Sequence, residues 1–470
     1  MPKKYAIHTK NAAPRFPPVG KYATVEFREN CAGSCRLCVR KQCVYNIFKD
    51  NFLHWSNMCE PQYLYTCKSC YRCVEECTKG IFSMSINPEY RTLGDDYWTP
   101  GIINSTWAQA HTGNIPVSGA GYRGPFAGEG FDSIWTDMSE IVRPTRDGIH
   151  GREYISTMVE LSRRPMKLEF GEDMSLITKP SPILEIPLPV TFQQPSFGIL
   201  SEEVLLSMAR SANEVGTLMF IDPENYSFAF SEFSSSLVPR LTASNYYKYS
   251  EIIRKSQMVE LSYSPTVENE FTRLREIKPG LIISVGIPLN NKAAGLALAL
   301  SKTEVDTVHF YGSDNGRELD ADNPRYLKDM IREIHLELVK NNIRSRVNLV
   351  FSGGIAMAEH VAKSLICGAD AVAVDLSLLI ALECRLCYRC KDSKSCPVKL
   401  EEVQQEWGAQ RIINLMGAWH NQLLEVMGAF GIREARRIRG EVGRSMWFDD
   451  LERDSFSPLF GTRKVTGIGY

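Results

Sequence analysis

Short apolar runs alternate with longer, helix-patterned segments through the part of the chain that follows Pro180. Between the apolar runs, segment 201–215 begins with a capping Ser201 and carries Glu203 in its first turn, and segment 323–342 has apolar residues at helical spacing. This order of elements is typical of parallel βα units. The apolar runs occupy residues 189–194, 216–221, 258–263, 281–286, 307–312, 347–354 and 371–375.

The number of these runs decides between a barrel and an open sheet. Seven strands over roughly 200 residues, with room for an eighth between Phe228 and Leu241, fit a closed (β/α)8 barrel better than an open sheet. We therefore predict an α/β fold in which residues 180–400 form a TIM barrel. The amphipathic helical pattern beyond Pro397 predicts a helical C-terminal extension over residues 401–470.

Two further parts precede the predicted barrel. Residues 1–90 form a cysteine-rich unit, which is interrupted by the aromatic stretch 46–58. Residues 91–179 are rich in glycine, proline and aromatic residues and then become charged. We expect this second part to be an extended segment that wraps the other parts of the chain.

Charge and hydropathy exclude several classes of protein. The 54 basic and 55 acidic residues give a net charge of -1, which indicates neither a nucleic-acid partner nor a membrane surface. Residues 1–20 contain no apolar leader, and no uncharged apolar run is long enough to span a bilayer. We therefore expect a cytoplasmic protein, whose reduced cysteines serve as metal ligands rather than in disulfides.

Twelve of the fourteen cysteines fall into three sets of four, and the first two sets have the spacing of a two-cluster bacterial ferredoxin. In such domains the fourth cysteine of each run binds the cluster of the other run. We therefore predict that residues 1–90 form a small α+β ferredoxin-like domain with two 4Fe-4S clusters. A structural zinc site is the alternative, because paired cysteines also bind zinc. The two sets are Cys31, Cys35, Cys38 and Cys43, and Cys67, Cys70, Cys73 and Cys77.

The third set lies in loop 384–396, shortly after the last predicted strand, and comprises Cys384, Cys387, Cys390 and Cys396. Its spacing and the following Pro397 indicate a third iron–sulfur cluster, with zinc as the alternative. Barrels commonly bind phosphate where strands seven and eight end, because glycines expose backbone N–H groups there. The candidates are the tripeptides 352–354 (SGG) and 368–370 (GAD), which would suit a flavin phosphate close to the cluster.

Three residues outside these sets have open roles. Cys59 could replace an irregular ligand such as Cys31, whereas Cys367 is expected to be a buried apolar residue in a barrel helix. His309 lies on a predicted strand, where it either donates to a substrate or flavin or is simply satisfied within the core.

Several motifs together resemble a known family. The stretches PVTFQQPSFGILSEE and VNLVFSGGIAMAEHVAKSLICGADAVAVD and the run ECRLCYRCKDSKSCPV follow one another as in the FMN-binding synthase domain of glutamate synthase, especially its archaeal-type forms with a fused ferredoxin domain. The resemblance implies an FMN-binding barrel beside an iron–sulfur cluster. It also implies that the flavin contacts come from Ser196, Gly198, Gly312, Gly353, Gly354, Gly368 and Ala369.

The chain departs from this family on the substrate side. The glycine-rich KPGEGG segment has no counterpart after strand 258–263, and the lysine of a valine-lysine-leucine strand is replaced at Gly286. Family loops typically carry three cysteines, whereas the four here favour a 4Fe-4S cluster. No amidotransferase cysteine is evident at the N-terminus, so a separate subunit would have to supply ammonia. The resemblance therefore implies a retained flavin scaffold with a rebuilt substrate face.

The leading hypothesis is an iron–sulfur flavoprotein oxidoreductase that passes electrons from ferredoxin-type clusters to FMN for two-electron reduction of a small acceptor. The family reaction would convert 2-oxoglutarate and ammonia to glutamate, and a different small acceptor stays open. The alternative is a non-catalytic electron-transfer subunit of a larger redox complex, with FMN as a relay. We expect a redox protein partner, such as a ferredoxin or other oxidoreductase subunits, and assembly as an oligomer or complex subunit. The sequence assigns no catalytic residue.

Overall fold

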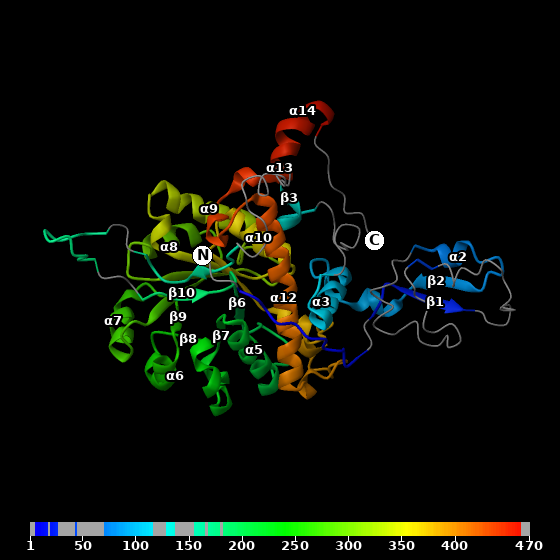
Figure 1. Ribbon diagram of the computed structural model, residues 1–470, viewed down its shortest axis with the longest axis horizontal. Helices are drawn as coiled ribbons and strands as arrows, with labels where there is room; N and C mark the ends of the chain where they lie inside the picture. The colour runs from blue at the N-terminus through cyan, green and yellow to red at the C-terminus, as the bar shows by residue number, and fades with distance from the viewer. Residues whose placement is uncertain are drawn as a thin grey trace.

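Eight parallel strands close into a barrel that is surrounded by helices (Figure 1). The computed structural model describes residues 5–16, 19–26, 43–44, 70–115, 128–136, 155–164, 168–178 and 182–461. The strand order around the barrel is β10-β11-β12-β13-β6-β7-β8-β9, and the pairing of β13 with β6 closes it. The predicted α/β (β/α)8 barrel is therefore confirmed.

The eighth strand, for which the sequence only left room, is β8 (Leu237–Leu241), and it follows the 3-10 helix η6 (Phe228–Ser236). Its sequence LVPRL contains a proline and an arginine, which hide the apolar pattern of a buried strand. The other barrel strands are β6 (Val190–Gln193), β7 (Met219–Ile221), β9 (Met258–Ser262), β10 (Ile282–Pro288), β11 (Thr307–Tyr311), β12 (Asn348–Ser352) and β13 (Ala371–Val374).

One barrel helix begins at the capping serine that the sequence predicts. Helix α5 (Glu202–Val215) begins after Ser201, whose Oγ accepts a hydrogen bond from the Val204 amide at 3.4 Å, and it ends at Gly216 in the left-handed conformation. The other barrel helices are α6 (Ser250–Lys255), α7 (Glu268–Ile277), α8 (Ala293–Leu300), α9 (Leu327–Lys340), α10 (Ala358–Cys367) and α11 (Leu376–Ala381).

Short 3-10 turns connect many of these elements. They are η2 (Pro88–Thr92), η3 (Gly130–Ser133), η5 (Pro223–Asn225), η7 (Tyr246–Tyr249), η8 (Arg344–Arg346), η9 (Arg389–Asp392), η10 (Leu400–Glu402), η11 (Ala435–Arg437) and η12 (Val442–Arg444).

The predicted helical extension contains the long helix α12 (Gln405–Phe430), which packs against α5, α10 and α3 (Pro100–Thr112). Beyond it lie α13 (Phe448–Leu451), the π-helical turn η13 (Glu452–Phe456) and α14 (Ser457–Phe460). Helix α3 corrects the expectation of an extended segment over 91–179. Residues 102–104 and 106–110 of α3 are all buried, so its sequence shows no polar face that would mark a helix.

The N-terminal cysteine-rich part is described only in places. Strand β1 (Tyr22–Glu26) pairs antiparallel with β2 (Phe82–Ile86), and the short helix α2 (Arg72–Glu75) lies in the second cysteine run. Residues 27–42 and 45–69 of the predicted ferredoxin-like domain lie outside the described residues. Two more small sheets pair β14 (Ser445–Trp447) with β3 (Ile134–Thr136), and β4 (Val159–Glu160) with β5 (Glu185–Ile186).

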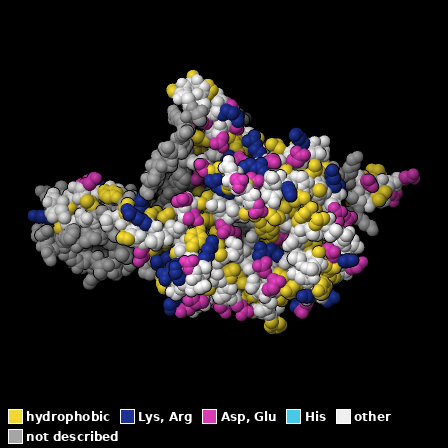
Figure 2. All heavy atoms as spheres, turned by 180° about the vertical axis from the view of Figure 1, so that it is seen from behind, with side chains coloured by type: hydrophobic (Ala, Val, Ile, Leu, Met, Phe, Trp, Pro, Cys, Tyr) yellow, Lys and Arg dark blue, Asp and Glu magenta, His cyan; other side chains and the backbone are white. Residues whose placement is uncertain are grey.

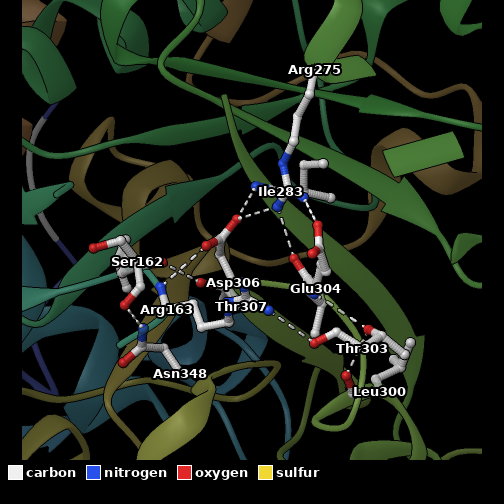
Figure 3. A network of polar contacts seen from close by, with 12 residues as sticks. Ser162, Arg163, Arg275, Ile283, Leu300, Thr303, Glu304, Asp306, Thr307 and Asn348 are labelled. Atoms are coloured by element: carbon white, nitrogen blue, oxygen red, sulfur yellow. Dashed lines mark hydrogen bonds and ion pairs between the residues drawn. The ribbon is translucent and has the colours of Figure 1, made fainter. Parts of the chain in front are cut away.

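A buried polar network holds the segment before the barrel against the amino ends of the strands (Figure 3). The Asp306 carboxylate accepts hydrogen bonds from the backbone amides of Arg163 at 3.2 Å and Ile283 at 2.9 Å. Burial raises the pKa of Asp306. The Asn348 amide also donates to Ser162 O at 2.8 Å. This network covers part of the amino end of the barrel. The carboxyl ends of the strands, where barrels of this kind place their sites, lie at the opposite end, which is called the open end below.

Among the described residues, no helix is both long and apolar enough to cross a membrane. Acidic and basic side chains lie interspersed over the described part of the face in Figure 2, in agreement with the balanced charge of the sequence.

Candidate functional site

The loops at the carboxyl ends of β6 and β11 meet through a side-chain hydrogen bond. Ser196, in the turn after β6, donates from Oγ to the Asp314 carboxylate, with distances of 3.1 and 3.3 Å to its two oxygens. The segment before α3 holds the same loops from outside. The Trp98 indole donates to Asp314 O at 2.8 Å, and the Tyr97 hydroxyl donates to Gly354 O.

Glycines allow the loops after β11 and β12 to interlock. Gly353 and Gly354 have φ angles of 97° and 68°, in the left-handed region that side chains disfavour. A Cβ atom at Gly353 would lie 2.6 Å from Ser313 O, and one at Gly312 would lie 3.0 Å from Ser352 O. The close packing of these loops therefore already accounts for the three glycines, and any flavin contact is an additional role.

Five of the seven predicted flavin residues lie at the carboxyl ends of the strands, and two do not. Gly368 ends helix α10 and Ala369 precedes strand β13, so both lie at the amino end of the barrel. Beside them, Asp370 accepts from the Leu349 amide at 2.8 Å and pairs with Arg344 at 2.6 Å. We therefore exclude Gly368 and Ala369 from the candidate site, because one bound flavin phosphate cannot reach both ends of a packed barrel.

The residue that follows β13 at the open end is Asp375, which the sequence analysis missed. Asp375 is 4% exposed, and its carboxylate accepts a hydrogen bond from the Leu376 amide at 2.6 Å, at the start of α11. Burial and the neighbouring Asp314 raise the pKa of Asp375 to about 6, although Arg240 acts in the opposite direction. A carboxylate thus stands where barrels of this type commonly bind phosphate.

We expect replacement of Asp375 with asparagine to stabilise the protein at pH 8 and to have little effect at pH 4. The neutral acid is favoured by folding, so its contribution is complete below its ordinary pKa of 3.8 and is lost as the pH rises through about 6. The shift corresponds to on the order of 3 kcal/mol, and Asn can still accept the Leu376 hydrogen bond. Urea unfolding at the two pH values measures the difference, with the exposed Asp322→Asn as the control; an equal effect at both pH values would contradict the assignment.

A buried polar cluster lies inside the barrel, below the open end. His309 Nδ1 lies 2.9 Å from Glu260 Oε2, and the Ser284 hydroxyl donates to the same oxygen at 3.1 Å. The His309 ring lies between Phe220 and Tyr311, with ring centroids 4.6 and 4.4 Å away. His309 Nε2 has no hydrogen-bond partner among the described residues. The described part of the core thus provides a hydrogen-bond partner for only one of the two ring nitrogens of His309.

The third cysteine set follows α11 and forms one local cluster. Burial raises the pKa of Cys384 to about 12, and the thiols of the other three cysteines add to the shift, so the four sulfurs are neighbours. No three of them bring their sulfurs within 4.8 Å of one another, judged over the described part of the chain. The loop is tightly turned, with Leu386 and Tyr388 at φ angles of 45° and 55°.

Aromatic side chains join this cysteine loop to the turn after β6. The Phe197 and Tyr388 rings have centroids 5.3 Å apart, and the Lys391 ammonium lies over both rings at 4.3 and 4.7 Å. The Tyr388 hydroxyl donates to Asp95, next to the segment that holds the loops after β11 and β12. The cysteine loop is therefore packed directly against the candidate flavin turn.

The N-terminal cysteines are described only in part. Cys43, Cys70, Cys73 and Cys77 are described, the last two at helix α2, whereas Cys31, Cys35, Cys38, Cys59 and Cys67 lie outside the described residues. The two predicted N-terminal clusters therefore stay predictions. Cys367 is buried in α10, as expected, and burial raises its pKa to about 12.

A (β/α)8 barrel with a cysteine loop packed at its open end makes the chain a candidate redox enzyme. Comparison with known proteins indicates which redox enzymes it resembles. Residues 250–433 match the conserved region in glutamate synthase. The archaeal-type glutamate synthase (NADPH) of Dehalococcoides mccartyi is 24% identical over 437 residues, which cover 80% of this chain and 85% of that protein. The archaeal glutamate synthase (NADPH) of Archaeoglobus fulgidus is 22% identical over 504 residues, which cover 91% and 95%.

These relatives confirm the predicted resemblance, and the chain is an enzyme similar in sequence to glutamate synthase. Among solved structures, a mutant flavocytochrome b2 with pyruvate bound is 11% identical and has a TM-score of 0.41, over 72% of this chain and 84% of that one. A similarity of that size carries no argument about function.

Proposed function

We propose that the protein is an iron–sulfur flavoenzyme that takes single electrons from a redox partner and uses FMN for the two-electron reduction of a small acceptor. The observation that carries the proposal is the packing of the cysteine loop, through Tyr388, against Phe197 in the turn after β6. Bound FMN would accept electrons singly and release them in pairs. The protein's part is to hold the two redox sites side by side and to keep them out of water.

The residues at the open end suit the flavin itself better than they suit its phosphate. Ser196, Gly198, Gly312, Gly353 and Gly354 offer a hydroxyl group and close backbone approach, and Gly198 has a φ angle of 121° that suits glycine. The Asp375 carboxylate would repel a phosphate dianion. Arg240 is the cation that lowers the pKa of Asp375. We therefore assign these five residues to the flavin and assign no residue to its phosphate.

The spacing of the third set along the sequence favours an iron–sulfur cluster over zinc. Three cysteines separated by two residues each, with a fourth directly before Pro397, are typical of a cubane loop, so Cys384, Cys387, Cys390 and Cys396 suit a 4Fe-4S cluster. The two N-terminal sets, by their spacing, would hold two more.

The relatives named glutamate synthase suggest the acceptor. In that reaction 2-oxoglutarate and ammonia lose water to give an imine, and two electrons and two protons then convert the imine to glutamate. Ammonia would come from a separate subunit, and electrons from a ferredoxin or another oxidoreductase subunit. The replaced lysine at Gly286 favours a second candidate function, an electron-transfer subunit in which FMN is a relay.

An anaerobic experiment distinguishes these functions. The purified protein is reduced by a one-electron donor, and the visible flavin band is followed before and after addition of 2-oxoglutarate with ammonium. The proposed function predicts bleaching of the flavin in the wild type. Return of the band with formation of glutamate identifies the family acceptor, whereas a flavin that stays reduced indicates a different acceptor or a relay. A protein that carries no reducible flavin would contradict the proposal.

A further inference from the structure

A side chain at position 286 would occupy the space that the Tyr311 ring fills inside the barrel. A Cβ atom at Gly286, on β10, would lie 2.7 Å from Tyr311 Cε2 and 3.0 Å from its hydroxyl oxygen, on the neighbouring strand β11. The same atom would lie 3.2 Å from Glu260 Oε1. The backbone of Gly286 is not in the left-handed region, so conformation does not require glycine there. The space taken by the Tyr311 ring is therefore the structural reason for the missing side chain.

The Tyr311 ring is held in place from below. Its centroid lies 4.4 Å from that of His309, and His309 is fixed by the Glu260 carboxylate at 2.9 Å. Phe220 packs on the same imidazole from across the barrel, at 4.6 Å. Tyr311 is the last residue of β11 and is partly exposed, so its ring lies between this buried cluster and the open end.

The open end around Tyr311 is rich in carboxylates. Asp222, Asp314 and Asp375 follow strands β7, β11 and β13, and Arg240 lies near the end of β8. Arg240 is already paired with Asp222 at 2.8 Å. Among the described side chains named here, the three carboxylates outnumber Arg240, which is already paired, and Lys391, which lies over the Phe197 and Tyr388 rings. This excess of negative charge disfavours an acceptor with two negative charges. A basic side chain at position 286 would offset this charge, but Tyr311 excludes it.

We propose that Tyr311, together with Gly286, determines acceptor specificity by filling the volume from which a side chain on β10 would reach the acceptor. The pair favours 2-oxo or imino acceptors with one negative charge or none over dicarboxylates. This inference rests on the proposed function, because it concerns the acceptor that the flavin site would reduce.

The shared volume is tested first, by a double-mutant cycle on stability. Gly286→Ala is expected to lower the melting temperature in the wild-type background and to lower it much less in the Tyr311→Ala background, where only the Glu260 contact at 3.2 Å remains. Tyr311→Phe keeps the ring, so Gly286→Ala should remain destabilising beside it. An equal loss in all three backgrounds would show that the two positions are independent and would overturn the proposal.

Specificity is tested by acceptor binding rather than by turnover. The affinities of 2-oxoglutarate and of pyruvate, which carries a single carboxylate, are measured by calorimetry on the flavin-loaded oxidised protein. Wild type and Tyr311→Phe are expected to bind pyruvate at least as tightly as 2-oxoglutarate. The Gly286→Lys/Tyr311→Ser variant is expected to bind 2-oxoglutarate at least about tenfold more tightly than wild type, the gain typical of one charge-assisted contact.

Three results would each overturn the inference. The wild type could prefer 2-oxoglutarate, the double variant could bind 2-oxoglutarate with unchanged affinity, or neither acid could bind to any of the proteins. The proposed function fails separately, by absence of flavin and iron in the wild type. If Gly286→Lys/Tyr311→Ser does not fold, Tyr311→Ser alone is used, and it should still relax the preference for pyruvate.

Discussion

Replacement of Cys387 with serine is expected to remove the iron–sulfur cluster of loop 384–396 and to stop the flavin from being reduced by a one-electron donor. Cys387 is one of the four cysteines of this loop, whose thiols lie close enough to act on the pKa of Cys384. Loss of one ligand from a cubane should lower the iron content by about four atoms per chain. Iron analysis, and the rate of flavin bleaching after anaerobic mixing with the donor, measure the two effects.

The matched control for this experiment is Cys367→Ala. Cys367 is buried in α10 and acts as an apolar residue, so its replacement should leave iron content and flavin reduction unchanged. Unchanged iron in Cys387→Ser, or an equal loss of iron in Cys367→Ala, would show that the loop does not hold a cluster. Zinc in place of iron in the wild type would favour the structural alternative.

Replacement of Arg411 with methionine is expected to lower the free energy of unfolding by about 3–5 kcal/mol, because it leaves buried carbonyls without their charged donor, at about 1–3 kcal/mol each. Its guanidinium is fully buried in α12 and donates to Ala381 O at 2.6 Å, Ala12 O at 3.0 Å and Trp107 O at 3.5 Å. One side chain thus joins α12 to α11, to α3 and to the N-terminal segment, and methionine would leave the three buried carbonyls without this donor.

Urea unfolding of the holo protein measures this loss. Arg437→Met is the control, because the Arg437 side chain is 71% exposed and its ion pair with Glu434 contributes little. A loss below about 1 kcal/mol in Arg411→Met, the size of an ordinary neutral hydrogen bond, would show that the network is not essential. Because Ala381 lies three residues before Cys384, we also expect faster loss of iron from this variant.

The barrel could be predicted from the sequence because burial on both sides of parallel strands leaves a clear apolar run in each. Strand β8 was the weak point, since Pro239 and Arg240 interrupt its run. Helix α3 was missed for the opposite reason: burial nearly all round removes the polar face that marks a helix. Cysteine spacing was informative because metal ligands must recur at short, fixed intervals.

The candidate site was predictable only where a local motif carried it. Gly368 and Ala369 were wrongly expected at the flavin site. Both precede strand β13, and residues that precede a parallel strand lie at its amino end. Asp375 directly follows β13 and could have been found by that rule. The contact between Tyr311 and the space at Gly286 depends on the register of two strands, which no local pattern reveals.

The central claim is that this chain holds iron–sulfur clusters and FMN together. The most direct test is analysis of iron, acid-labile sulfide and FMN in anaerobically purified wild-type protein, with electron paramagnetic resonance spectra during stepwise reduction. The account predicts about twelve iron atoms and about one FMN per chain, and signals from reduced 4Fe-4S clusters. A colourless protein that contains zinc, no labile sulfide and no flavin would contradict it.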